Sequence, residues 1–173
     1  MRNSEREYFI VKFVFPSKSV FLLWYTDAVD GFVLRPSDNI ISDTVKIMTF
    51  SEKEEAIQYA HLNAWTLDYS ITQIICNLQA LVPQNEQFDC NQVLTFWNIV
   101  SDFSRLTMSK FSGDEKNGQI NDLYNKLFFA CNLPSIKKDD REFVPIWSNK
   151  EVTLLRDIVT DGLHLLSVLL IDI

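Results

Sequence analysis

The sequence contains few of the residues from which catalytic and cofactor sites are usually built. Only four glycines and two histidines occur among its 173 residues. So few glycines leave little room for loops that cradle phosphate groups, and the P-loop, GxGxxG, GxSxG and HExxH motifs are all absent from the sequence. We therefore expect a binding protein without a cofactor and without enzymatic activity, although a site built from scattered carboxylates stays open.

The three cysteines, Cys76, Cys90 and Cys131, are an odd number at wide spacings, and no CxxC pair occurs. This pattern indicates neither a disulfide framework nor a zinc site. Cys76 and Cys131 lie in apolar stretches and are interpreted as small core residues. A reducing compartment is the simpler expectation for such a chain.

The two histidines do not form a recognisable catalytic pattern. His61 lies at the end of a charged segment, and His164 lies in the apolar C-terminal segment. A functional pair is one interpretation. The simpler one places His61 on the surface and packs His164, with a hydrogen bond, in the interior.

Neither end of the sequence predicts a membrane segment. Residues 1–7 are polar and lack the apolar core of a signal peptide. The apolar run 163–173 contains His164 and Asp172, and it is shorter than the roughly 18–20 residues that a membrane span needs. We expect this run to be the end of a buried helix.

The charge of the chain is acidic and unevenly distributed. The net charge is −7, and residues 51–122 carry ten carboxylates against four Lys or Arg, a net charge of −6. Affinity for nucleic acid comes mainly from Lys and Arg, so this balance argues against direct binding of DNA or RNA. The excess of negative charge favours a basic protein as the partner.

The length and composition fit one globular domain spanning 1–173. Apolar residues make up 47% of the chain and aromatic residues 13%, enough for a sizeable core. Residues 1–50 read as strands with short links, at 8–15, 20–25, 32–35 and 44–50. Short links favour antiparallel pairing.

From residue 51 onward the apolar spacing is helical. Five helices are predicted, over about 51–62, 66–81, 89–109 and 119–131, with a last one of roughly twenty residues beginning at Ser148. Ser51 with Glu54 and Ser148 with Glu151 match a capping box, and Asp89 is a predicted N-cap. The fold class is therefore α+β, with a small N-terminal antiparallel sheet of three to four strands in residues 1–50 and about five helices in 51–173.

A candidate partner-binding surface combines carboxylates with aromatic anchors. The carboxylates lie on the predicted sheet loops and at the start of the first helix, and the aromatic residues flank the same loops. The predicted set is Asp27, Asp30, Asp38, Asp43, Glu52, Glu54, Glu55, Trp24, Tyr25 and Phe32. Favourable contact with the helix dipole also explains the three glutamates, and core packing also explains the aromatics.

Several segments of the second half are similar to a known family. The segments are Val93-Leu94-Thr95-Phe96-Trp97-Asn98 after Asp89, Leu123-Tyr124-Asn125-Lys126-Leu127-Phe128, Asn132-Leu133-Pro134, and Pro145-Ile146-Trp147-Ser148 before a long helix. Together they resemble bacterial immunity proteins of contact-dependent growth inhibition systems. The resemblance covers roughly residues 85–165. Its motifs fall on the core-facing sides of helices, so they indicate the scaffold rather than the contacts.

The resemblance implies a cytoplasmic protein that binds and neutralises the toxic C-terminal domain of a surface-delivered effector. Such toxins are commonly nucleases with basic clefts, and inhibition is stoichiometric and needs no cofactor. Two other classes stay open: an adaptor that binds a helix or peptide along an exposed strand edge, and a small hydrolase with an unmarked carboxylate site.

Overall fold

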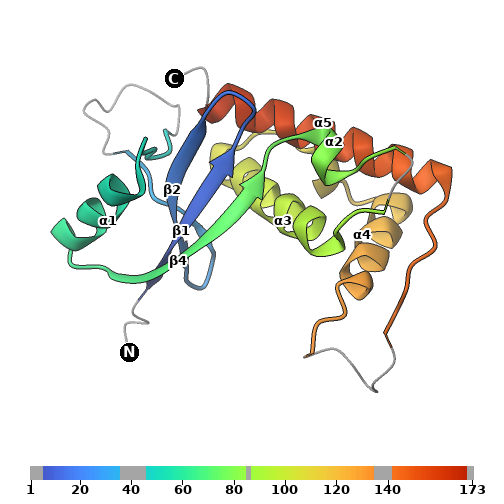
Figure 1. Cartoon of the computed structure of the whole chain (residues 1–173), viewed down its shortest axis with the longest axis horizontal. Helices are drawn as coiled ribbons and strands as arrows, with labels where there is room; N and C mark the ends of the chain where they lie inside the picture. Colours follow the sequence, from blue (N-terminus) through green and yellow to red (C-terminus); the bar gives the residue numbers. More distant parts are fainter. Residues whose placement is uncertain (1–5, 36–45, 85–86, 135–141, 171–173) are drawn as a thin grey trace.

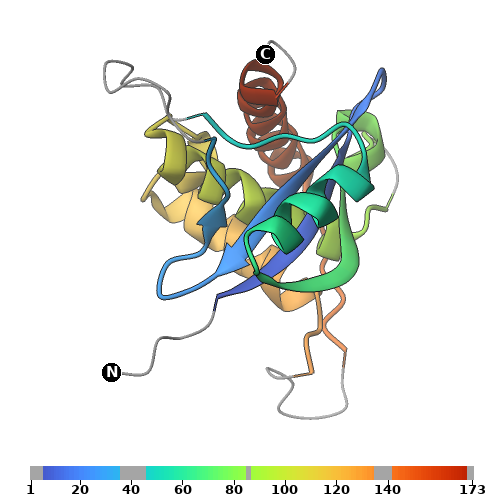
Figure 2. The same ribbon diagram turned by 90° about the vertical axis from the view of Figure 1, so that its left-hand side faces the viewer.

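A four-stranded sheet separates one helix on one face from the other long helices on the opposite face (Figures 1 and 2). The structure is a computed structural model that describes residues 6–35, 46–84, 87–134 and 142–170. The strands come first, at the N-terminal end, and most of the helices follow, which confirms the predicted α+β class.

The sheet contains β1 (Glu7–Val14), β2 (Ser19–Thr26), β3 (Gly31–Phe32) and β4 (Thr66–Ile75), in the order β3-β2-β1-β4. β1, β2 and β3 pair antiparallel through short turns, as predicted. β4 pairs parallel with β1, so the sheet is mixed rather than purely antiparallel. Helix α1 (Lys53–Leu62) lies between β3 and β4 in the chain and supplies the longer connection that a parallel pair requires.

The predicted helix over 66–81 is wrong. Residues 66–75 form β4, and only Leu78–Leu81 form a short helix, α2. The apolar residues of this stretch satisfy helical spacing, but five of the ten strand residues are Thr or Ile, whose branched side chains favour a pleated strand. Pairing along the whole of β1 then decides between the two structures.

The predicted third and fourth strands contribute less pairing than expected. β3 is limited to two residues, and beyond it Leu34 forms an isolated bridge with Ile47. Phe50 forms a second isolated bridge with Phe21. The stretch 46–50 therefore extends the sheet by single bridges, while residues 44 and 45 lie outside the described part of the chain.

The continuous apolar runs of β1 and β2 are explained by burial on both faces. Tyr8, Ile10 and Leu23 point to the side covered by α1, where they pack with Ala56 and Ala60. The alternate residues of the two strands join the larger core beneath the helices of the other face. That core contains Val11, Phe13, Leu22, Phe96, Phe103, Leu155 and Ile158.

The helices of the second face are α3 (Cys90–Thr107), α4 (Gly118–Ala130) and α5 (Asn149–Leu170), with the short 3₁₀ helix η1 (Ser112–Asp114) before α4. The Asp89 side chain accepts hydrogen bonds from the first backbone N–H groups of α3, which confirms the predicted N-cap. The predicted Ser148–Glu151 capping box is also present, at the start of α5. The box of α1 is formed one residue later than predicted, by Glu52 and Glu55.

The described part of the predicted C-terminal run, residues 163–170, is the end of α5, where Leu166 and Leu170 are buried as expected, and residues 171–173 lie outside the described part of the chain. None of the helices in the described ranges is both long and apolar enough to cross a bilayer. Gly162, in the middle of α5, lets this helix approach α3. A Cβ at Gly162 would lie 2.9 Å from a ring carbon of Phe96 and 3.2 Å from a methyl of Val100.

Candidate partner-binding cleft

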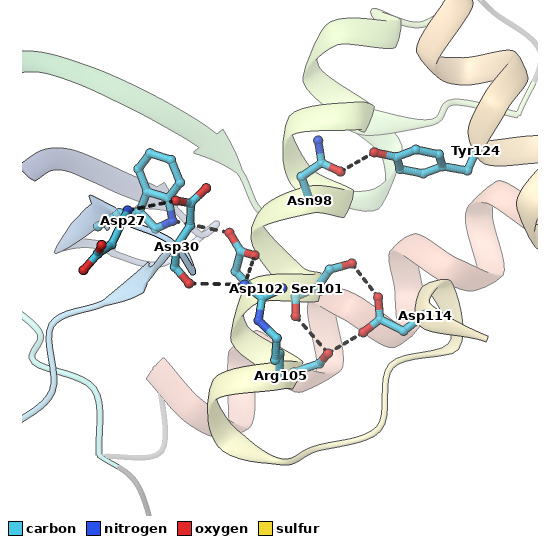
Figure 3. Close-up of polar contacts among 10 residues, drawn as sticks. Asp27, Asp30, Asn98, Ser101, Asp102, Arg105, Asp114 and Tyr124 are labelled. Carbon is cyan, nitrogen blue, oxygen red and sulfur yellow. Dashed lines mark hydrogen bonds and ion pairs between the residues drawn. The ribbon is translucent and has the colours of Figure 1, made fainter. Parts of the chain in front are cut away.

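A hollow of about 680 Å³ lies where the β2–β3 turn meets α3, η1 and α4. We call it the α3 cleft. Three carboxylates and one guanidinium line it, together with polar and aromatic side chains. Those used below are Trp24 and the residues Asp30, Asn98, Asp102, Arg105, Asp114 and Tyr124, which Figure 3 labels.

Asp102 on α3 connects the helix to the sheet at one side of the cleft. Its carboxylate accepts a hydrogen bond of 3.3 Å from Nε1 of Trp24 on β2 and one of 2.7 Å from Arg105 one turn along the helix. Arg105 also donates to the carbonyl of Asp30, at 3.2 Å, which ties the β2–β3 turn to α3. The Arg105 guanidinium thus binds two groups of this same chain.

Burial raises the pKa of the Asp102 carboxyl above its ordinary value, because its side chain is only 16% exposed. Arg105 and Trp24 act in the opposite direction, and the negative charge of Asp30 adds to the rise. The carboxylates of Asp30 and Asp102 therefore repel each other, and a cation placed between them would reduce this repulsion.

Asp114 holds η1 against α3. Its carboxylate accepts the hydroxyl of Ser101 at 2.6 Å and that of the buried Ser104. The residue before it must be glycine for this close approach, because a Cβ at Gly113 would lie 2.8 Å from Nε1 of Trp97. Asp114 is an exposed residue that lines the cleft, and its carboxylate points toward Ser101 on α3 (Figure 3).

The opposite wall of the cleft is neutral. Tyr124 on α4 donates its hydroxyl to the side-chain oxygen of Asn98 on α3 at 2.8 Å, and its ring meets Trp97 edge to face at 5.4 Å. A neighbouring hollow shares Asp114 and adds Glu115 and Asp161 against Lys110. The acidic character thus continues beyond the α3 cleft toward α5.

The predicted partner-binding residues are divided between the two faces of the sheet. Trp24 and Asp30 line the α3 cleft. Tyr25 packs on the other face against Tyr8, with Arg6 over its ring. Asp27 is exposed and forms an ion pair of 2.8 Å with Arg6, so its charge is largely compensated.

The predicted glutamates lie with α1, on the face of the sheet away from α3 (Figure 2). All three are exposed, and Glu52 and Glu55 form the capping box of that helix. The helix N-terminus thus accounts for two of the three charges, as the alternative interpretation held. Asp38 and Asp43 lie outside the described residues.

The prediction that Phe32 contacts the partner is wrong. Phe32 is 0% exposed and packs 4.3 Å, centroid to centroid, from Phe103. It is a core residue because β3 packs against the C-terminal part of α3, where the Phe32 ring also meets Phe13 of β1.

Sequence reasoning missed the carboxylates that the structure brings together with Asp30. Neither Asp102 nor Asp114 belongs to the predicted partner-binding set. The available signal was the polar series Ser101, Asp102, Ser104 and Arg105 beside the apolar stripe of α3. Such a series is also typical of a solvated helix face, so it could not reveal contacts with β2 and η1.

No group of three or more His, Cys, Asp or Glu placed to hold a metal ion occurs within residues 6–35, 46–84, 87–134 and 142–170. Cys76 and Cys131 are buried in the larger core, as predicted. Burial raises the pKa of the Cys76 thiol to about 12 and that of Cys131 to about 11, so both are poor nucleophiles.

The two histidines lie on different elements. His61 is exposed, as expected, and hydrogen-bonds the Tyr69 hydroxyl at 2.7 Å. His164 was expected to be packed, but it is exposed on the outer side of α5, because the buried stripe of that helix runs through Leu155, Ile158 and Leu166.

The chain has no significant match among models of known protein families, curated protein sequences or solved structures.

Proposed function

We propose that the chain is an immunity protein that binds and neutralises the toxic C-terminal domain of a cognate contact-dependent growth inhibition effector, a basic nuclease domain. The observation that carries the proposal is the α3 cleft, which is lined by Asp30 of the β2–β3 turn, Asp102 of α3 and Asp114 of η1, against the one guanidinium of Arg105. The sequence resemblance of residues 85–165 supplies the class of partner.

The chemistry of the cleft suits a basic protein surface. Carboxylates at a concave surface raise the local concentration of a cationic partner and accelerate its association. An arginine of the partner could form paired hydrogen bonds with Asp30 or Asp114, whose carboxylates keep free acceptor positions. Trp24 and Tyr124 offer aromatic surface beside these charges, which favours a guanidinium or ammonium group.

Such binding is stoichiometric and needs no cofactor. The inhibitor acts by occupying or covering the surface with which the toxin holds nucleic acid. The proposal places the protein in the cytoplasm, where a delivered nuclease meets its substrate, and it involves no direct contact between this chain and nucleic acid.

A co-expression experiment tests this function. The chain is produced together with the toxin domain encoded beside its gene, and cell survival and co-purification of the two proteins are measured. We expect the wild-type chain to protect the cells. Asp30→Lys reverses a charge in the α3 cleft and should weaken protection, whereas Glu54→Lys makes the same charge change on α1 and should not.

Absence of both protection and a complex would refute the immunity function. Equal loss of protection by the two variants would leave the function standing and show that the cleft has no special role.

A carboxylate-based hydrolase is the second candidate, favoured by the raised pKa of Asp102 beside the hydroxyl-rich site of Asp114. Purified protein can be assayed with p-nitrophenyl acetate and p-nitrophenyl phosphate. Turnover that disappears in Asp102→Asn and persists in Glu54→Lys would favour this candidate over an inhibitor.

A further inference from the structure

Strand β4 lies at the edge of the sheet and has one open side. Among the described residues it pairs with β1 alone, and their sheet order places no further strand beyond it (Figure 1). Five consecutive residues, 69–73, are exposed, which is unusual for a strand whose neighbour β1 is buried at every second position or more. The backbone of this edge is therefore accessible.

The register identifies the backbone groups that face outward. The N–H of Cys76 donates to the carbonyl of Val14 on β1 at 2.9 Å. Successive residues of a strand turn their N–H and C=O groups to opposite sides. Ile71, Gln73 and Ile75 consequently present theirs to the open edge. β4 pairs with β1 on its other side, and none of the turn and loop hydrogen bonds among the described residues involves these outward groups.

This edge lacks the features that usually prevent strand pairing. Residues 69–76 contain no charged residue, no proline and no glycine. Exposed edges are normally protected by such residues, or by bulges or covering elements. A bulge at Tyr69 and Ser70, where the charged Asp68 accepts the Ser70 N–H at 2.7 Å, protects the first half of the strand. It leaves the regular stretch from Ile71 to Ile75 available.

Different surfaces flank the open edge of β4 on the two faces of the sheet. On the α1 side, the apolar or aromatic side chains of Leu62, Tyr69 and Ile71 are 86%, 54% and 40% exposed. On the other side, Thr72 lines the α3 cleft. A partner held in the α3 cleft would thus lie beside the open edge of β4.

We propose that the partner adds an extended, uncharged segment as a fifth strand along Ile71–Ile75, while its basic surface occupies the adjoining α3 cleft. This inference rests on the proposed function and specifies how the partner is held. Main-chain hydrogen bonds supply affinity in such strand addition, and pockets beside the edge supply specificity.

Charge distinguishes this occupant from a second copy of the chain. Two copies would bring net charges of −7 together, with an acidic cleft beside each paired edge. A basic domain is attracted to the same place. The edge itself is neutral and accepts an uncharged strand in either case, so the flanking charge selects the partner.

Gln73→Pro tests the proposal at an outward-facing position. Proline removes the N–H that would bind the added strand, and it is tolerated at a sheet edge whose N–H faces solvent. Gln73→Ala is the matched control, because it removes the side chain and keeps the N–H. Ile71→Lys places a charge on the same edge and serves as a second variant if Gln73→Pro fails to fold.

The affinity of each variant for the toxin domain is measured by titration calorimetry, and hydrogen exchange is followed in the wild-type complex. We expect Gln73→Pro and Ile71→Lys to weaken binding by about tenfold or more, while Gln73→Ala changes it less than about threefold. The amides of Ile71, Gln73 and Ile75 should be protected in the complex.

A complex that forms with unchanged affinity in both variants, and with unprotected edge amides, overturns the strand addition but leaves the inhibitor function intact. Failure of any complex to form overturns both. A wild-type dimer in size-exclusion chromatography that Gln73→Pro converts to a monomer would assign the edge to a second copy instead, against the proposal.

Discussion

The indole N–H of Trp24 on β2 donates to the carboxylate of Asp102 on α3, across 78 positions of sequence and 3.3 Å of space. This bond links the sheet to the helix that covers it. The other carboxylate oxygen of Asp102 receives Arg105, which also reaches the carbonyl of Asp30. The position of the acidic α3 cleft relative to the sheet therefore depends on Asp102.

Asp102→Asn should change the pH dependence of stability. The pKa of Asp102 is raised in the folded protein, so the protonated carboxyl stabilises the folded state relative to the unfolded chain. This stabilisation is fully present below the ordinary pKa of 3.8 and is lost as the pH rises through the folded-state pKa. The free energy of unfolding of the wild type, measured by urea denaturation, should fall relative to that of Asp102→Asn over this interval. A difference that grows in favour of the wild type as the pH rises would contradict the assignment.

Glu151→Gln should show the opposite dependence. Burial pushes the pKa of Glu151 up, but Lys126 at 2.7 Å and the N–H and hydroxyl of Ser148 outweigh it, so the folded-state pKa is lowered. The stabilisation is present above the ordinary value of 4.5 and is lost as the pH falls through the folded pKa. At pH 7 the variant should lose about 1 kcal/mol of unfolding free energy.

The same denaturation series provides the check for Glu151. The wild type and Glu151→Gln should converge at acid pH. A stability difference that is independent of pH would mean that the Lys126 contact does not involve the ionised carboxylate.

Gly162→Ala should destabilise the protein although alanine favours helices. Alanine gains about 1 kcal/mol of helix propensity over glycine, but overpacking in a dense core costs about 1–3 kcal/mol. The added methyl would meet the Phe96 ring at 2.9 Å, so we expect a net loss of about 1 kcal/mol by thermal or urea unfolding. Gly118→Ala is the control, since nothing lies within 4 Å of its Cβ position. Equal stabilisation of both variants would refute the close packing of α5 on α3.

The cysteines should differ in reactivity. Cys90 is half-buried at the start of α3, whereas Cys76 and Cys131 are buried. Alkylation with iodoacetamide at pH 8, followed by mass spectrometry, should label Cys90 first in the native protein. Labelling of Cys76 should require unfolding. Rapid labelling of Cys76 in native protein would contradict its place in the larger core.

Local patterns in the sequence predict the parts of the fold that local physics determines. The apolar runs of residues 8–15 and 20–25 predict strands where β1 and β2 lie, and Asp89 and the Ser148–Glu151 pair mark helix starts at the observed places. The stretch 66–75 is different. Its apolar residues fit helical spacing and a strand equally, and only pairing with β1, some sixty residues earlier, decides between them.

The α3 cleft could be predicted only in part for the same reason. Trp24 and Asp30 were identified from the loop near the sheet, because both flank a turn. Their partner Asp102 lies in the middle of a helix, where a carboxylate is ordinarily solvated, and nothing local shows that β2 packs beside it. Glu52 and Glu55 have a local function at the helix N-terminus, which the sequence could not separate from partner binding.

Association kinetics with the toxin domain, measured by surface plasmon resonance over a range of salt concentrations, test the acidic α3 cleft most directly. The wild type should bind, with an association rate that falls as salt is added, and Asp30→Lys should lower that rate by about tenfold while Glu54→Lys changes it little. Absence of binding at micromolar concentration, or equal effects of the two variants, would contradict the cleft as the site where a basic partner docks.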